Sequence, residues 1–111
     1  MPESPTPNTE TRFQILRALS HNPEMTQREL AGELGISLGK TNYCLRALVD
    51  KGLIKAANFK RSKRKARYLY QLTPSGLTEK AGLTRRFLQR KLEEHEALTA
   101  EIQRLREEIA G

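Results

Sequence analysis

Residues 26–37 read TQRELAGELGIS, and they contain the start and end of one short helix and the start of the next. Thr26 and Glu29 have the spacing of a capping box, in which the hydroxyl accepts from the Glu29 amide and the carboxylate reaches back to the Thr26 amide. The apolar face of this helix consists of Leu30, Ala31 and Leu34. Gly35 can adopt the left-handed conformation that ends a helix, and Ser37 is then the N-cap of the following helix.

The following helix is predicted over about residues 38–51. Its inward stripe is expected to consist of Leu38, Thr41, Leu45, Leu48 and Val49. Gly52 can end this helix as Gly35 ends the previous one. Because only a tight turn separates the two helices, they are expected to cross sharply rather than lie antiparallel.

A further helix is predicted before this pair, over residues 9–21. Its apolar residues recur at helical spacing and are Phe13, Ile15, Leu16 and Leu19. Asn8 or Thr9 is the candidate N-cap, and Pro23 closes the segment. Residues 1–8 contain three prolines among polar residues, so we expect a disordered tail there.

A β-hairpin is predicted after Gly52. One extended segment begins at residue 53, and another ends at residue 72. In the second segment Tyr68, Tyr70 and Leu72 alternate with Arg67, Leu69 and Gln71, so the tyrosine side is expected to be the buried one. Residues 58–65 are basic, with Phe59 as their one apolar residue, and are read as the tip of the hairpin.

The remaining residues predict one long helix. Thr73 is its candidate N-cap and Pro74 its first residue, and no later proline interrupts the roughly 37 residues that follow. A domain of this size cannot cover such a helix on all sides, so its narrow apolar stripe is interpreted as a coiled-coil seam with a second copy of the chain. The residues expected at this dimer interface are Leu88, Leu92, His95, Leu98, Thr99, Ile102, Leu105 and Ile109.

The heptad of this helix is imperfect, because two frames overlap and neither covers the whole stripe. Gly76 and Gly82 should weaken its first two turns. Arg85, Arg86, Arg90 and Lys91 precede a run of glutamates, which favours antiparallel pairing, although the sequence leaves the orientation open.

The chain has 111 residues and a formal net charge of +7, and this charge is concentrated in one place. Residues 1–54 contain six basic and six acidic residues, and residues 68–111 contain seven of each. The whole excess therefore lies in residues 55–67, which include no acidic residue. A patch of one sign indicates a polyanionic partner, most commonly nucleic acid, although a solvated loop is the simpler alternative.

Composition also excludes several classes of protein. The mean hydropathy is −0.66 and no long apolar run occurs, so no membrane span or secretory signal is expected. A single cysteine cannot form an internal disulfide. We therefore expect a cytoplasmic protein, acting at the nucleoid if its partner is DNA.

Three helices, a sharp turn and a hairpin with a basic tip follow the order of a winged helix-turn-helix. The expected fold class is thus mainly α (α+β), with a tail over residues 1–8, a winged domain over 9–72 and a dimerisation helix over 73–111. Residues 26–37 resemble the Thr-Gln-x-x-Leu-Ala-x-x-Leu-Gly-Ile-Ser signature of bacterial winged-helix regulators. Residues 45–54, LRALVDKGLI, resemble their passage from recognition helix into wing.

Over residues 12–105 the chain is similar to the MarR family, and within it to the short branch of regulators associated with exopolysaccharide gene clusters. The resemblance implies a DNA-binding transcriptional regulator. Because the long helix is expected to pair two copies, a homodimer on an inverted-repeat operator is expected. MarR proteins usually have extra helices at both ends that form a small-molecule pocket. The shorter ends of this chain put such an effector in doubt.

The third helix and the hairpin tip carry the expected DNA contacts. Asn42 can bond an adenine, Arg46 can reach guanine or phosphate, and Gly39 allows a close approach to the groove. The complete set of expected DNA-binding residues is Thr26, Gln27, Ser37, Gly39, Lys40, Asn42, Tyr43, Arg46, Lys60, Arg61, Ser62, Lys63, Arg64, Lys65 and Arg67. Each of those on the helices has the alternative role of a cap or a solvated surface residue.

Other chemistry finds little support in the sequence. Cys44 is more simply a core residue than an oxidant sensor. His21 and His95 have no partners at metal-ligand spacing, so no metal or other cofactor is expected. No phosphate loop or nucleophile elbow occurs, and an enzyme is not expected. The main alternative is an interaction module that binds a protein or RNA without operator specificity.

Overall fold

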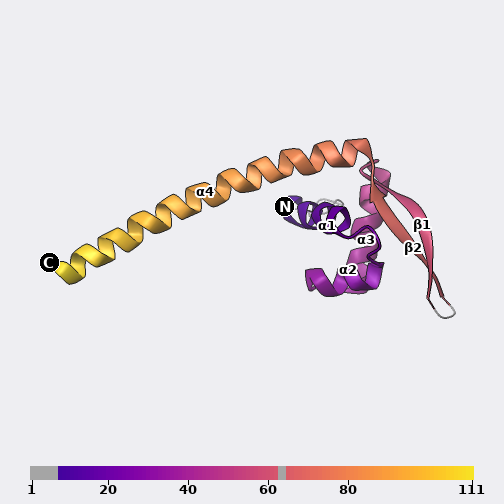
Figure 1. The fold of residues 1–111 in the computed structure, drawn as a ribbon, viewed down its shortest axis with the longest axis horizontal. Coiled ribbons are helices and arrows are strands. Elements are labelled where there is room, and N and C mark those ends of the chain that lie inside the picture. The colour runs from indigo at the N-terminus through magenta and orange to yellow at the C-terminus, as the bar shows by residue number, and fades with distance from the viewer. Residues whose placement is uncertain (1–7, 63–64) are drawn as a thin grey trace, which may run out of the picture. The chain divides into compact units, whose positions relative to one another are not determined.

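A computed structural model of the chain describes residues 8–62 and 65–111, and the side chains of residues 8–57 and 69–111. The chain folds as two compact units, Met1–Ala81 and Gly82–Gly111. The first unit contains α1 (Thr9–His21), α2 (Gln27–Leu34), α3 (Leu38–Asp50) and the antiparallel strands β1 (Ile54–Ser62) and β2 (Lys65–Leu72). A last helix, α4 (Pro74–Ala110), begins in the first unit and continues through the second (Figure 1). The predicted fold class is confirmed.

Each of the four helices starts at a side-chain cap that the sequence predicted. Asn8, rather than Thr9, caps α1, and its Oδ1 accepts from the Thr11 amide at 2.8 Å. The capping box of α2 is complete, with the Thr26 amide donating to Glu29 Oε1 at 2.9 Å and the Glu29 amide donating to Thr26 Oγ1 at 3.2 Å. The remaining two caps are Ser37 for α3 and Thr73 for α4.

Two glycines end α2 and α3 with the same arrangement of hydrogen bonds. Gly35 and Gly52 have φ angles of 67° and 73°, a left-handed conformation that other residues adopt at a cost. After α2, the Ile36 amide donates to the carbonyl of Ala31 at 3.1 Å, and after α3 the Leu53 amide donates to that of Leu48 at 3.0 Å. This is the Schellman motif, which turns the chain sharply and directs the next residue toward the core. Figure 1 accordingly shows α2 and α3 at a steep angle to each other.

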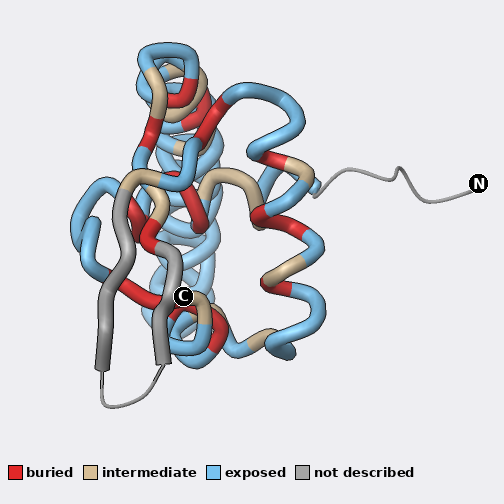
Figure 2. Tube along the Cα trace, turned by 90° about the vertical axis from the view of Figure 1, so that its right-hand side faces the viewer, coloured by how far each residue is buried: buried red, intermediate tan, exposed pale blue. Residues whose placement is uncertain are grey.

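The core of the first unit lies among α1, α2, α3 and the near ends of the strands. Buried and exposed segments alternate along each of these helices (Figure 2). The buried apolar residues of these elements are Ile15, Leu16, Ala18, Leu19, Leu30, Ala31, Cys44, Leu45, Leu48, Ile54, Leu69 and Leu72.

The inward stripe of α3 differs from the predicted one at both ends. Leu38 and Val49 were expected to be buried but are 42% and 40% exposed, and Cys44 is buried instead. At about 100° per residue, Leu38 and Val49 lie roughly 70–90° from the centre of the stripe that Thr41, Cys44, Leu45 and Leu48 form. They therefore flank the buried face.

The buried side of β2 also differs from the prediction. Leu69 was expected to face outward and is buried, while Tyr70 is only half-buried. The register shifts opposite these residues, where Ala56 pairs with Tyr70 but Asn58 pairs with Leu69. An extra residue of this kind increases the local twist of a strand pair and redirects side chains, so simple alternation fails here.

Gly76, in the first turn of α4, lies against the chain that leaves α3. A Cβ on Gly76 would come within 2.0 Å of the Leu53 carbonyl oxygen, whereas one on Gly82 would meet nothing within 4 Å. The Thr73 amide donates to the same carbonyl at 3.0 Å. Gly76 was expected only to weaken the helix, but it allows the close backbone approach on which this junction depends.

Near its start, the second unit contains a buried residue of α4, Leu83, and a half-buried one, Phe87, and the helix is exposed beyond them. Every residue from Leu88 to Gly111 is exposed, including all six leucines and isoleucines of the predicted seam. Within the part of the chain that the structure describes, no helix combines the length and the hydropathy needed to cross a membrane.

Candidate nucleic-acid interface

The outward face of α3 is polar and accessible at the positions that the sequence predicted. Gly39, Lys40, Tyr43 and Arg46 are exposed, and Tyr43 keeps 49% of its surface accessible. Asn42 is half-buried. A Cβ on Gly39 would meet no other part of the chain within 4 Å, so this turn of α3 is open on its outer side.

Asn42 is held by Gln27, which lies at the start of α2. Asn42 Nδ2 donates to Gln27 Oε1 at 3.3 Å, and Gln27 Nε2 donates to the Leu38 carbonyl at 3.5 Å. Because the Leu38 carbonyl can only accept, the nitrogen of the Gln27 side-chain amide must point toward it. The oxygen of that amide then points toward Asn42, which must present its own nitrogen to Gln27. One Nδ2 hydrogen and the whole of Oδ1 of Asn42 remain available to a ligand.

The two caps near this face differ in their accessibility. Ser37 is exposed, and its Oγ accepts from the Lys40 amide at 3.0 Å, at the open N-terminus of α3. Thr26 is only 4% exposed, and its side chain is engaged in the capping box. Thr26 therefore positions α2, whereas Ser37 and the first amides of α3 lie where an anion can approach.

A small hollow separates the second half of α3 from the root of the hairpin. Its volume is about 250 Å³, and its lining residues are Arg46, Val49, Asp50, Ala56 and Tyr70. Val49, Ala56 and Tyr70 were not among the predicted site residues. Their contribution depends on how α3 packs beside the strands, a long-range relation that no local motif signals.

The hairpin gathers cationic residues toward its far end. The backbone register places Lys60 opposite Arg67, Arg61 opposite Ala66 and Ser62 opposite Lys65. The predicted residues Lys63 and Arg64 lie outside the described residues, as do the side chains of the other five. The register thus collects the charged positions of both strands at the same end of the sheet.

Cys44 lies on the inner side of α3, away from this face. It is 1% exposed, and burial raises the pKa of its thiol, with the positive charge of Lys40 acting weakly in the opposite direction. A protonated, inaccessible thiol is a poor nucleophile.

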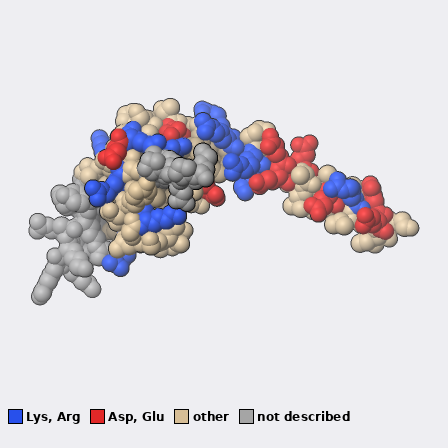
Figure 3. Space-filling view, turned by 180° about the vertical axis from the view of Figure 1, so that it is seen from behind, with Lys and Arg blue, Asp and Glu red and all other residues tan. Residues whose placement is uncertain are grey.

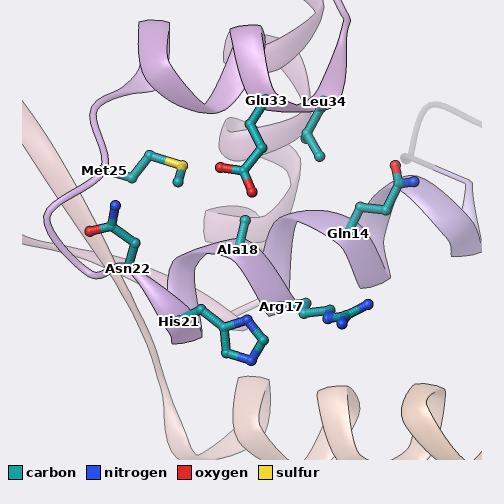
Figure 4. Close-up of a pocket in the computed structure, with 8 residues that line it drawn as sticks. All are labelled: Gln14, Arg17, Ala18, His21, Asn22, Met25, Glu33 and Leu34. Atoms are coloured by element: carbon teal, nitrogen blue, oxygen red, sulfur yellow. The ribbon is translucent and has the colours of Figure 1, made fainter.

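A second hollow, of about 440 Å³, lies between α1 and α2. Figure 4 shows Glu33 directed from α2 toward α1, with Arg17 and His21 on the other side of α1. The polar groups therefore do not converge on one point, as they would around a small charged ligand. Among the described residues, no cluster of three or more His, Cys, Asp or Glu could hold a metal ion.

Comparison with known proteins relates the first three helices to a family of DNA-binding domains. Residues 8–55, which span α1, α2, α3 and the start of β1, match the model of the winged helix-turn-helix DNA-binding family. A search of curated proteins found no match to the chain.

Several solved structures of regulators are similar to the chain. Staphylococcus aureus MarR, in complex with salicylate and kanamycin, is 24% identical with a TM-score of 0.58, over 82% of this chain and 57% of that one. A mutant MepR from a multidrug-resistant S. aureus isolate is 22% identical with a TM-score of 0.63, over 96% and 80%. Streptococcus pneumoniae FabT, in complex with DNA, is 24% identical with a TM-score of 0.57, over 76% and 57%.

The chain thus spans little more than half the length of the MarR and FabT chains. At these identities the likeness establishes the fold. The family model adds that the first three helices are those of a DNA-binding domain. The chain therefore contains a winged helix-turn-helix domain of the DNA-binding type, in a fold shared with MarR and related solved regulators.

Proposed function

We propose that the chain is a sequence-specific, DNA-binding transcriptional regulator of the MarR family that acts as a homodimer on an inverted-repeat operator. The observation that carries this proposal is the outward face of α3, where Asn42 is fixed by Gln27 beside the exposed Tyr43 and Arg46. Its sequence resemblance to the exopolysaccharide-associated branch suggests genes of exopolysaccharide synthesis as targets, and the nucleoid in the cytoplasm as its location.

Asn42 is suited to reading adenine in the major groove. The bidentate contact needs one amide hydrogen for N7 and one carbonyl oxygen for the N6 amino group. The bond to Gln27 leaves both available. Arg46 is placed for guanine or a backbone phosphate, and the apolar wall of Val49, Ala56 and Tyr70 beside it suits a deoxyribose.

Phosphate contacts are assigned to two regions. The first is the N-terminus of α3 with Ser37 and Lys40, where free amides and the helix dipole favour an anion. The second is the basic hairpin, residues 60–67, which we propose to be the wing that follows the backbone or the minor groove. If about five phosphates are neutralised per chain, the log-log salt slope of binding is about −4 to −5 for each half-site.

The proposed division of labour follows the expected domains. Residues 9–72 read DNA and residues 73–111 join two copies; of the expected tail, residues 1–7 lie outside the described residues and Asn8 caps α1. None of these roles requires catalysis.

The test is a binding titration against duplexes captured from the genome with the protein. We expect Asn42→Ala and Arg46→Ala to reduce the preference for the captured site by about tenfold or more each, with less effect on random DNA. The variant Lys63→Ala/Arg64→Ala/Lys65→Ala should weaken binding to both kinds of DNA and flatten the salt slope by about 2 to 3.

Arg104→Ala, on α4, is the matched control for loss of one charge and should change neither quantity. If no duplex is captured or bound at low salt, the regulator proposal fails and an interaction module for protein or RNA takes its place. If the triple variant keeps both affinity and salt slope, the role of the wing is wrong.

A further inference from the structure

The exposed seam of α4 has a regular order that the two overlapping heptads conceal. Its apolar members are 41% to 89% exposed and have no cover within the described chain. Leu88, His95, Ile102 and Ile109 follow one another at intervals of seven residues. At 3.5 residues per turn, these four form a straight central line along the helix.

Four further residues flank this line, two on each side. Leu92 and Thr99 lie four residues after members of the line, on one flank, and Leu98 and Leu105 lie three residues after members, on the other. One flank is thus occupied from residue 92 to 99 and the other from residue 98 to 105, so the occupied flank changes near the middle of the seam. This change of side is the reason that no single heptad frame fits.

The eight seam positions are symmetric about a point between Leu98 and Thr99. Each seam residue on one side of this point has another seam residue at the same distance in sequence on the other side. These mirror pairs are Leu98 with Thr99, His95 with Ile102, Leu92 with Leu105, and Leu88 with Ile109.

We propose that α4 pairs with α4 of a second copy in antiparallel orientation, with the two-fold axis passing between Leu98 and Thr99. In this arrangement each seam residue lies level with the mirror residue of the partner subunit, and each layer contains at least one leucine or isoleucine. The inference rests on the homodimer proposed above and specifies its orientation and register.

The charges outside the seam favour the same orientation. Basic and acidic groups follow one another in blocks along α4 (Figure 3). Glu94 and Glu96 flank the seam, and in a parallel pair each would lie level with the same glutamate of the second copy. In the antiparallel pair Glu94 lies level with Gln103 of the partner subunit, and only Glu96 lies level with a glutamate, Glu101 of the partner subunit. Like-charge repulsion is therefore smaller in the antiparallel pair.

Lys91 gives this arrangement a specific ion pair. It lies beside Glu94 of its own chain, at 3.1 Å between Nζ and Oε2, and it is well exposed. In the proposed register its level on the axis differs from that of Glu108 of the partner subunit by about 3 Å. The ammonium can thus bridge both carboxylates.

Disulfide trapping tests the orientation in the full-length chain. In the antiparallel pair, positions 88 and 109 of different chains are level, while the two copies of position 88 are about 32 Å apart. A disulfide needs Cα atoms within about 7 Å. We expect the double variant Leu88→Cys/Ile109→Cys to form covalent dimers, with mass spectrometry showing position 88 joined to position 109. Each single variant should remain free of crosslinks.

The matched control is Glu93→Cys/Arg104→Cys. These positions are also mirror related, but they lie on the opposite face of the helix, so no crosslink is expected. The native Cys44 is buried and serves as the internal background.

Each alternative outcome overturns a defined part of the proposal. Crosslinking of either single variant means parallel helices, and a dimer by light scattering without any crosslink in the double variant means a different register. A monomer by light scattering removes the dimer itself. Operator titration of the same variants is read separately, so failure of the orientation is distinguishable from failure of DNA binding.

Discussion

At the residue scale, two hydrogen bonds of the Gln27 side chain connect α2 with α3. Gln27 and Asn42 are 15 positions apart in sequence, and their bond exists only because α2 and α3 cross. The exposure of Tyr43 and Arg46 could be predicted from the stripe on α3, since helical periodicity is local. The partner of Asn42 could not, because it depends on tertiary geometry.

Removal of the Gln27 side chain should reduce the base selectivity of Asn42 more than the overall affinity of the protein for DNA. We expect Gln27→Ala to reduce discrimination at the adenine position by about tenfold while the salt slope stays the same. Gln27→Glu keeps an oxygen for Asn42 and should keep the discrimination, with weaker overall binding because of its negative charge.

Competition titrations with duplexes that differ at one base pair measure both effects. Gln14→Ala, an exposed glutamine of α1, is the matched control. Equal losses of affinity on all duplexes would show that Gln27 contacts phosphate and does not position Asn42.

Cys44 should be unreactive in the folded chain. Burial both raises the pKa of the thiol and blocks access, so the thiolate fraction at neutral pH is lower than for a free cysteine. We expect alkylation by iodoacetamide at pH 7 to be at least about tenfold slower than in denaturant, and to rise with pH. Peroxide treatment should leave DNA affinity unchanged. Fast alkylation of the folded protein would instead support an oxidant-sensing role.

At the scale of elements, the sequence predicts helix boundaries better than buried faces. The side chains of Thr26, Ser37 and Thr73 each accept from the amide three residues ahead, and Gly35 and Gly52 act through their own φ angles. Such signals are contained in a few consecutive residues. By contrast, the exposure of Val49 and the burial of Leu69 depend on packing between distant segments.

Replacing each of the two glycines at the start of α4 by alanine should have opposite effects on the stability of the chain. Gly82→Ala meets open space and should stabilise the chain by about 0.5 to 1 kcal/mol through helix propensity. Gly76→Ala drives a Cβ into the Leu53 carbonyl and should destabilise the chain by about 1 to 3 kcal/mol.

Urea unfolding of both variants, followed by circular dichroism, measures the difference. The pair is internally controlled, because the substitution and the helix are the same. Equal effects of the two substitutions would mean that the close approach at Gly76 has no energetic weight.

At the scale of the whole molecule, the proposed function depends on joining the winged domains of two copies through the exposed seam of α4. Replacing Leu98 next to the proposed axis by Asp would place two carboxylates together in the interface. We expect Leu98→Asp to raise the dimer dissociation constant at least about tenfold, which corresponds to about 1.4 kcal/mol or more. Affinity for a full operator should then depend on protein concentration, while affinity for a half-site should not change.

Ala97→Asp is the matched control, since residue 97 lies off the seam and is exposed. Sedimentation equilibrium gives the dimer dissociation constant of each variant, and operator titrations give its affinity for DNA. If Leu98→Asp remains as dimeric as Ala97→Asp, the seam is not the interface.

The separation of faces on α3 has a consequence for how a regulator of the proposed kind can evolve. Thr41, Cys44, Leu45 and Leu48 anchor the helix, while Gly39, Tyr43 and Arg46 contribute little to the buried core. Substitutions at the exposed positions can therefore accumulate without unfolding the domain, and natural selection or a randomised library can search for new target sites at little cost in stability. A duplicated copy of this chain could acquire a different set of genes through a few changes on one side of one helix.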